Sequence, residues 1–245
     1  APYGQIRPFQ NIIICLETAT NLCSVALCDS AGVISLRESN ESKSHASMLT
    51  VFIEEILKEH ELKAHNLEAV AVSKGPGSYT GLRIGVSVAK GIAYGASIPL
   101  IGVETTLAMF WGISGSRYFS PDVDMTTLFC PMLDARRMEV YYAIYDSGGN
   151  KIKDISAEII NKESFINFPE SQKIIFFGDG AKKCREVINR ENALFADDFK
   201  ISSSYMYRPA IQAFKDHHYE DVAYFEPLYL KDFITSKPRK NVLGV

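Results

Sequence analysis

The residues best suited to bind an anion lie around a glycine loop at 74–78. An apolar, β-branched run at 69–73 is broken by Lys74-Gly75-Pro76-Gly77, and a long segment without proline begins at Ser78. This order predicts a strand, a tight loop and a helix. Gly75 and Gly77 would let the backbone amides point outward, and Ser78 or Thr80 would cap the helix. Because a helix start carries partial positive charge, the loop would attract phosphate or carboxylate groups, although a glycine loop can also serve only as a turn.

A second glycine sequence, Gly178-Asp179-Gly180, lies between a predicted strand at 173–177 and a predicted helix at 181–189. Asp179 could orient the ribose of a nucleotide, or it could cap the helix, which is the commoner role. Arg136 and Arg137 could bind an anion or a partner's carboxylate, or they could belong to a solvated turn. The sequence alone does not decide which of these roles Asp179, Arg136 and Arg137 have.

The pattern of histidines, cysteines and serines argues against catalysis by this chain. His45 has Leu49 one helical turn away rather than a second histidine. The sequence also contains no closely spaced cysteine pair, no Walker lysine after a glycine loop and no Gly-x-Ser-x-Gly elbow. We therefore expect no metal site and no catalytic residues.

Charge and cysteine content exclude some classes of function. The formal net charge of −3 argues against a chain that holds nucleic acid on its own. The five cysteines are odd in number and lie mostly in apolar runs, as expected of reduced core residues in a cytoplasmic protein. No apolar run approaches the length of a membrane span, and the first residues lack the pattern of a signal peptide, so we expect no membrane association.

The elements that must position these residues form two similar series. Strands are expected at 11–19, 24–29, 33–38 and 69–73, and near 103, with helices at 48–62, at 78–95 and after a cap at Thr105 or Thr106. Glycine, serine, proline and aspartate then mark a boundary at 112–127. The pattern restarts with strands at 128–133, 138–145, 151–160 and 173–177 and helices at 163–168 and 181–189. We expect a duplicated α/β unit, with lobes at 11–111 and 128–233 and flexible ends at 1–10 and 234–245.

The helix at 78–95 carries small residues on two of its faces. Gly81, Gly85 and Ala89 form one row, while Ser87, Gly91 and Gly95 form another. Glycine inside a helix costs about 0.5–1 kcal/mol relative to alanine, so other backbones must approach closely. One row is explained by packing within the chain, and the second suggests a partner helix. Together with the broad apolar band of the helix at 48–62, this predicts an interface formed by Met48, Leu49, Phe52, Ile56, Gly81, Gly85, Ser87 and Ala89.

Several motifs, in order along the chain, carry a resemblance to a known family. They are Cys15-Leu16-Glu17-Thr18-Ala19-Thr20, Ser44-His45-Ala46-Ser47-Met48-Leu49, the block from Lys74 to Gly85, Asp134-Ala135-Arg136-Arg137-Met138-Glu139-Val140-Tyr141, and Glu226-Pro227-Leu228-Tyr229-Leu230. The chain resembles the TsaB (YeaZ) family of the actin-like, chaperone-ATPase-like superfamily. This resemblance implies an α/β fold of two ribonuclease-H-like lobes, with mixed sheets flanked by helices.

The resemblance also implies a nucleotide or anion site between the lobes. On this sequence it would fall on Thr18, Thr20, Gly75, Gly77, Ser78, Gly178, Asp179 and Gly180. Glu17 stands where many relatives have aspartate, and it could contact a ligand or tether neighbouring backbone amides. We expect no required cofactor and at most weak binding of ATP or ADP.

By resemblance, the chain is a non-catalytic scaffold that activates a TsaD-like catalytic subunit. That complex adds threonylcarbamoyl to adenosine beside the anticodon of tRNA and includes a TsaE-like ATPase. The chain would meet tRNA only through the complex, and it would form a homodimer when alone. The alternatives are a stand-alone nucleotide-binding ATPase or phosphotransferase of the same superfamily, and a glycoprotein peptidase.

Overall fold

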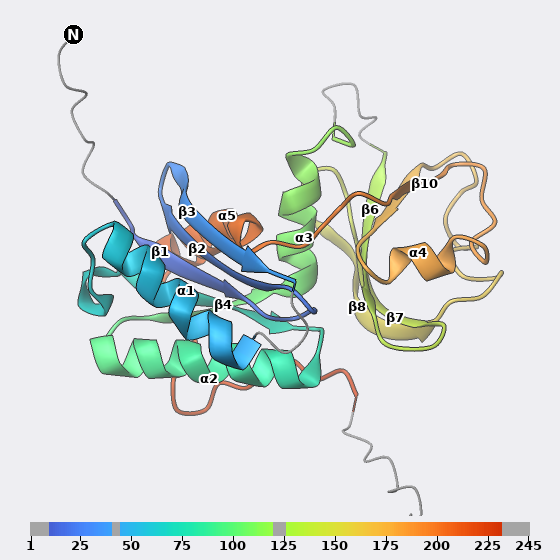
Figure 1. The fold of residues 1–245 in the computed structure, drawn as a ribbon. Helices are drawn as coiled ribbons and strands as arrows, with labels where there is room; N and C mark the ends of the chain where they lie inside the picture. Colours follow the sequence, from blue (N-terminus) through green and yellow to red (C-terminus); the bar gives the residue numbers. More distant parts are fainter. Residues whose placement is uncertain (1–9, 41–44, 120–125, 232–245) are drawn as a thin grey trace, which may run out of the picture.

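The computed structural model describes residues 10–40, 45–119 and 126–231. Two mixed sheets lie beside one another, with helix α3 (Thr105–Ser114) standing between them (Figure 1). The expected α/β class with two lobes is therefore confirmed. The ends expected to be flexible, 1–10 and 234–245, lie outside the described residues except for Gln10.

The first sheet has the strand order β3-β2-β1-β4-β5. β1 pairs antiparallel with β2 and parallel with β4, so Ile14 lies opposite both Leu27 and Val70. Helices α1 (His45–Glu59) and α2 (Tyr79–Ala96) cover one face, and α1 begins three residues before the predicted start. The strands are β1 (Ile13–Glu17), β2 (Cys23–Asp29), β3 (Gly32–Ser39), β4 (Ala69–Gly75) and β5 (Leu100–Glu104).

The second sheet repeats the first in order and direction. Its order is β10-β9-β6-β7-β8, with β6 antiparallel to β7 and parallel to β9, as β1 is to β2 and β4. This equivalence confirms the predicted duplication at the level of topology. The strands are β6 (Leu128–Asp134), β7 (Glu139–Tyr145), β8 (Lys151–Ile159), β9 (Ile174–Phe177) and β10 (Ala193–Ala196).

Helix α3 packs between the two sheets, and helix α5 (Tyr207–Lys215) packs on the sheet of the other series. Met109 and Phe110 of α3 lie in a core cluster with Phe129 of the second sheet. Ile211 of α5 lies with Cys15 in a cluster of the first sheet. The lobe expected at 128–233 is therefore not self-contained. The apolar faces of α3 and α5 determine that both helices must be buried, and α3 contacts both sheets while α5 covers the first.

Several local predictions in the second half are wrong. The segment at 163–168 forms turns rather than a helix, and α4 (Ala181–Cys184) ends well before the predicted 189. In the first half, neither Thr105 nor Thr106 caps α3: Glu104 is at the cap position and makes no side-chain bond there. β10, α5 and the short helix η2 (Ser203–Met206) had no counterpart in the sequence-based expectations.

The cysteines behave as expected of core residues. All five are free and buried. Burial raises the pKa of the Cys23 thiol to about 11. Within the described part of the chain, no helix is long and apolar enough to cross a membrane.

Candidate functional site

Helix α2 begins in direct contact with the turn that joins β1 to β2. The Ser78 hydroxyl caps the helix by accepting from the Gly81 N–H at 3.3 Å, and the Ser78 N–H donates to the Ala19 carbonyl at 2.6 Å. A β-carbon on Gly77 would lie 2.4 Å from that same carbonyl oxygen. The glycines of this region therefore serve close packing within the chain, and the predicted Ser78 cap is present.

Two buried polar side chains, Glu17 and Thr18, lie at the end of β1. Glu17 Oε1 accepts from the Ala19 N–H at 2.6 Å, and the Thr18 N–H donates to the Ser73 hydroxyl at 3.3 Å. Glu17 Oε2 and Thr18 Oγ1 are buried without a hydrogen-bond partner. Burial raises the pKa of the Glu17 carboxyl to about 7. Glu17 thus tethers the backbone of the turn, the simpler of its two expected roles.

A segment near the C-terminus covers the glycine loop and then crosses to the second lobe. The Leu228 N–H donates to the Lys74 carbonyl at 2.6 Å, and a β-carbon on Gly75 would lie 2.8 Å from the Leu228 carbonyl oxygen. The ring of Tyr229 packs against that of Tyr79 in a tilted arrangement, with ring centroids 4.9 Å apart. Lys231, at the end of this segment, forms an ion pair with Glu139 of β7. We call residues 225–231 the C-terminal strap, because they connect the glycine loop of the first lobe to the second lobe.

The second glycine loop is also closely packed. A β-carbon on Gly178, which has a φ of +102°, would lie 2.3 Å from the Met132 carbonyl oxygen. The Gly180 N–H donates to that carbonyl at 3.0 Å. Asp179 accepts from the Asp134 N–H at 3.0 Å, and α4 has no side-chain cap. Asp179 therefore holds the end of β6 rather than capping the helix.

The residues predicted for a nucleotide form two groups. Thr18, Gly77 and Ser78 meet at the end of the first sheet, where Thr20 also accepts from the Leu22 N–H at 3.3 Å. Gly178, Asp179 and Gly180 lie at the end of the second sheet, against β6. In both groups the backbone already engages its own neighbours. A nucleotide site at these residues stays a prediction.

Most of the residues predicted for a partner interface are buried in the chain's own core. Leu49, Phe52, Ile56 and Ala89 belong to the core of the first lobe, and Gly81 and Gly85 are buried beside it. The chain's own core therefore covers these residues of α1 and this row of α2. Ser87 is exposed and Met48 is partly buried at the edge of that core.

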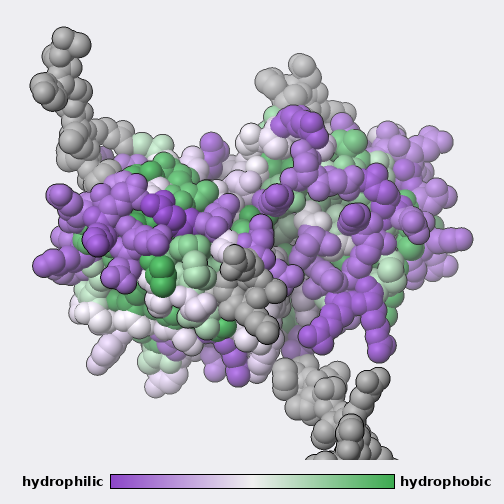
Figure 2. Space-filling view, in the orientation of Figure 1, coloured by the Kyte–Doolittle hydropathy of each residue, from purple (hydrophilic) through white to green (hydrophobic). Residues whose placement is uncertain are grey.

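The second row of small residues on α2 faces outward. Gly91 and Gly95 are exposed, and a β-carbon on either would meet nothing within 4 Å. Tyr94, between them, is 83% exposed. Ile84 and Val88 are only partly buried against the core. We call Ile84, Ser87, Val88, Gly91, Tyr94 and Gly95 the outer face of α2. Figure 2 shows mainly neutral and hydrophobic surface over α2 and mixed hydrophilic and hydrophobic surface over α1, whereas the second lobe is mostly hydrophilic.

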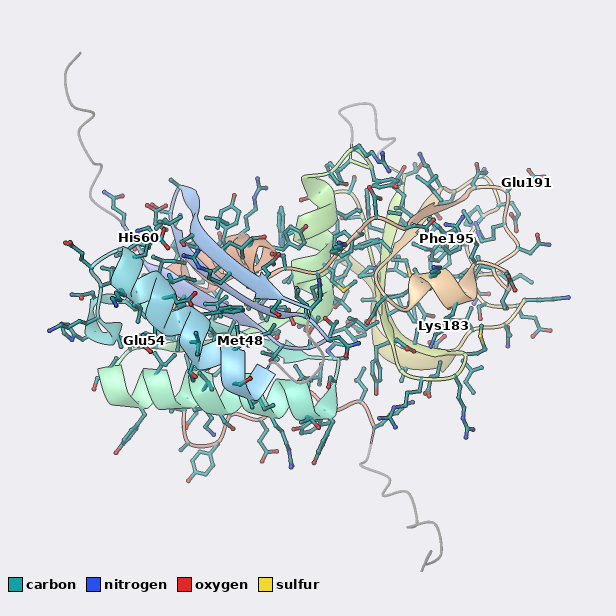
Figure 3. All side chains as sticks on the ribbon, viewed as in Figure 1. Met48, Glu54, His60, Lys183, Glu191 and Phe195 are labelled. Carbon is teal, nitrogen blue, oxygen red and sulfur yellow. The ribbon has the colours of Figure 1, made fainter. Side chains whose placement is uncertain are left out.

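Other features of the structure do not gather into a site. Met48 and His60 lie at opposite ends of α1 (Figure 3), and no group of three or more potential metal ligands occurs among the residues described. A pocket of about 570 Å³ lies between the ends of β3 and α3. Two of its charged lining residues pair with each other, since Arg117 lies 3.0 Å from Asp198.

Two equivalent mixed sheets with helices packed against them define a class of protein, a duplicated, two-lobed α/β fold. Residues 37–234 match the family model described as "TsaD: tRNA N6-adenosine threonylcarbamoyltransferase", and the chain belongs to this family. The resemblance seen in the motifs, to the TsaB (YeaZ) branch, is also confirmed.

Individual relatives match along nearly their whole length. The "tRNA threonylcarbamoyladenosine biosynthesis protein TsaB" of Escherichia coli is 28% identical, over 92% of this chain and 96% of its own. The protein of the same name from Haemophilus influenzae is 26% identical, over 93% and 97%. Among solved structures, YeaZ from Pseudomonas aeruginosa superposes with a TM-score of 0.76 at 19% identity, covering 90% of this chain and 100% of that chain.

Sequence reasoning missed some residues that the structure brings forward. Gly91 and Gly95 belong to the second row of small residues but not to the predicted interface. The spacing of small residues along the helix does not say which of its two rows faces the sheet. The ion pair between Glu139 and Lys231 joins the motif at 134–141 to the residue that directly follows the motif at 226–230. Only their shared place in the family pattern could have signalled it.

Proposed function

We propose that this chain is a non-catalytic, activating subunit of the complex that adds threonylcarbamoyl to adenosine beside the anticodon of tRNA. The proposal is supported by its match, along nearly the full length of both chains, to proteins named for tRNA threonylcarbamoyladenosine biosynthesis. A TsaD-like catalytic subunit is the partner, and a TsaE-like ATPase completes the complex. The chain meets tRNA within this assembly.

The outer face of α2 is the observation that carries the proposal of a partner. Glycine in a helix interior costs about 0.5–1 kcal/mol relative to alanine. Gly91 and Gly95 gain no compensating contact within the chain, because nothing lies within 4 Å of a β-carbon at either position. A partner helix that approaches closely would supply this compensating contact, with the exposed ring of Tyr94 beside it. When the partner is absent, the same face would pair with a second copy of this chain.

A scaffold role is also supported by the state of the glycine loops. The strap occupies the open side of Gly75 through Leu228, and the Ser78 N–H is engaged by Ala19. A phosphate cradle needs free backbone amides in such a loop. These contacts favour a loop that holds the fold together over one that binds a nucleotide during a reaction.

Co-purification with the cognate TsaD-like subunit tests the proposal, followed by a threonylcarbamoyl transfer assay with and without this chain. We expect a stable complex and transfer that depends on adding the chain. A partner subunit that neither binds the chain nor responds to it would contradict the proposal. Transfer by the chain alone would contradict its non-catalytic role.

A further inference from the structure

The turn between β6 and β7 presents two arginines in an unfavourable backbone conformation. Arg136 has a φ of +72° and Arg137 a φ of +49°, and both side chains are exposed. In this left-handed region an ordinary residue costs roughly 1–2 kcal/mol, and glycine or asparagine is usual. Two consecutive arginines there call for an explanation, because such strain persists mainly where it serves a function.

The acidic side chains of this turn are already neutralised by lysines from other elements. Asp134 forms an ion pair with Lys183 of α4, which also donates to the Glu139 carbonyl at 2.7 Å. Figure 3 shows Lys183 on the side of α4 that faces β7. Glu139 forms an ion pair with Lys231 at the end of the strap.

These ion pairs leave both guanidinium groups without a partner in the described parts of the chain. The Arg136 N–H donates to Asp134 Oδ1 at 2.8 Å, and the Glu139 N–H donates to the Arg136 carbonyl at 3.1 Å. The backbone of the turn is therefore held at both ends while its side chains are free. The charges of Asp134, Arg136, Arg137 and Glu139 sum to zero, so the cluster is positive once Lys183 and Lys231 are counted, within a chain whose formal net charge is −3.

The surroundings favour a phosphate ligand over a protein surface. A protein interface needs an apolar centre within a polar rim. At 134–138 the exposed side chains are Asp134, Arg136 and Arg137, all charged, and Ala135 and Met138 are partly buried. Arginine is the residue best suited to bind phosphate through paired N–H groups. Contacts of this kind position a nucleic acid without reading its sequence.

We propose that Arg136 and Arg137 form a contact for the phosphate backbone of RNA, made when this chain is part of its assembly. The inference rests on the proposed function, which brings tRNA to that assembly. Two neighbouring arginines would contact adjacent phosphates. They would add to the affinity supplied by the partner subunit rather than bind RNA alone, as the net negative charge requires.

The test measures binding of a fluorescent tRNA transcript to the assembly of this chain with the TsaD-like subunit, between about 50 and 200 mM salt. For the Arg136→Ala/Arg137→Ala double variant we expect weaker binding. The slope of log K for binding against log salt concentration should also become less steep by about two, about one for each arginine. Lys162→Ala/Lys173→Ala is the matched control, since both lysines are exposed on the same lobe and the change in charge is equal. Arg136→Lys/Arg137→Lys should retain most of the affinity.

The outcomes separate this inference from the proposed function. Unchanged affinity and salt dependence in a double variant that still assembles would overturn the phosphate contact and leave the proposed function intact. Loss of the catalytic subunit from the double variant would overturn it too, and would identify the turn as a protein docking site. Failure of the wild-type chain to assemble would contradict the proposed function itself. Circular dichroism of each variant confirms that it is folded.

Discussion

A β-carbon on Gly81 would lie 2.1 Å from the carbonyl oxygen of Thr18. That oxygen belongs to the backbone and cannot turn aside as a side chain would. One turn further along α2, a β-carbon on Gly85 would lie 2.3 Å from Thr18 Oγ1. The first turns of α2 therefore rest directly on the β1–β2 turn, and their glycines are required by the fold.

This contact predicts opposite effects for the same substitution at two sites of one helix. Gly81→Ala should lower the free energy of unfolding by about 1–3 kcal/mol, because overpacking displaces the β1–β2 turn. Gly91→Ala should raise it by about 0.5–1 kcal/mol, because its β-carbon enters open space in a helix. Urea unfolding of both variants measures the difference. Equal effects at the two sites would show that Gly81 is not in contact with Thr18.

The outer face of α2 predicts a variant that is folded but unable to pair. Gly91→Leu or Ser87→Leu should abolish association with the TsaD-like subunit, since a bulky side chain would separate the two helices. Light scattering and pull-down measure the association. Lys215→Leu on the exposed side of α5 is the control and should pair normally. By contrast, Ala89→Leu should unfold the chain, because Ala89 is fully buried. Normal pairing by Gly91→Leu would place the interface elsewhere.

The buried carboxyl of Glu17 predicts a stability that falls as pH rises. Its pKa is about 7 in the folded chain and near 4.5 when exposed, so the folded state binds the extra proton between these values. Raising the pH from 4.5 to 7 should therefore remove about 3 kcal/mol of stability, with little further change above pH 7. Glu17→Gln should lack this component. Urea unfolding at several pH values measures the free energy of unfolding of both proteins. A difference between wild type and Glu17→Gln that does not vary with pH would contradict the prediction.

The engaged glycine loops predict weak binding of nucleotide. Calorimetric titration with Mg-ATP should give no saturable heat at micromolar concentrations, because the backbone of 75–78 is packed by Ala19 and Leu228. The TsaE-like ATPase, titrated in the same buffer, is the positive control. Micromolar affinity for Mg-ATP would favour the alternative function, a stand-alone nucleotide-binding ATPase or phosphotransferase.

The strained turn predicts that removing an arginine increases stability. Arg136→Gly should raise the free energy of unfolding by up to about 1 kcal/mol, since glycine adopts a positive φ without steric cost. Lys182→Gly, within α4, is the control and should be destabilising. A destabilised Arg136→Gly variant would show that the arginine supports the fold, and would weaken the case for its role in binding.

The first lobe could be predicted closely because its elements have strong local patterns. Short apolar runs rich in β-branched residues located β1 to β4, and Ser78 located the start of α2. The two rows of small residues on α2 were visible, yet which row faces the sheet depends on a tertiary contact, that of Gly81 and Gly85 with Thr18. The predicted interface therefore falls largely on the buried row of α2 and the buried face of α1.

The second half was less predictable because its helices are short. α4 has only four residues, and 163–168 forms turns, so neither segment shows a helical period. The apolar face of α3, including Phe110 and Ile113, would suit either sheet, so its packing on the second sheet leaves no trace in the local pattern. The roles of Asp179 and Lys231 likewise depend on partners distant in sequence, Asp134 and Glu139.

The packing of α5 on the first sheet has a consequence for how the chain is made. One face of the first sheet, around Cys15 and Ala71, is covered by Ile211 and its neighbours. During synthesis on the ribosome, that face therefore stays open until residue 215 has left the exit tunnel, long after β5 is complete. Domains usually fold one after another as they emerge, and an uncovered apolar face is prone to aggregation meanwhile. The two lobes must instead mature together, and a fragment ending near residue 119 should need a chaperone to stay in solution.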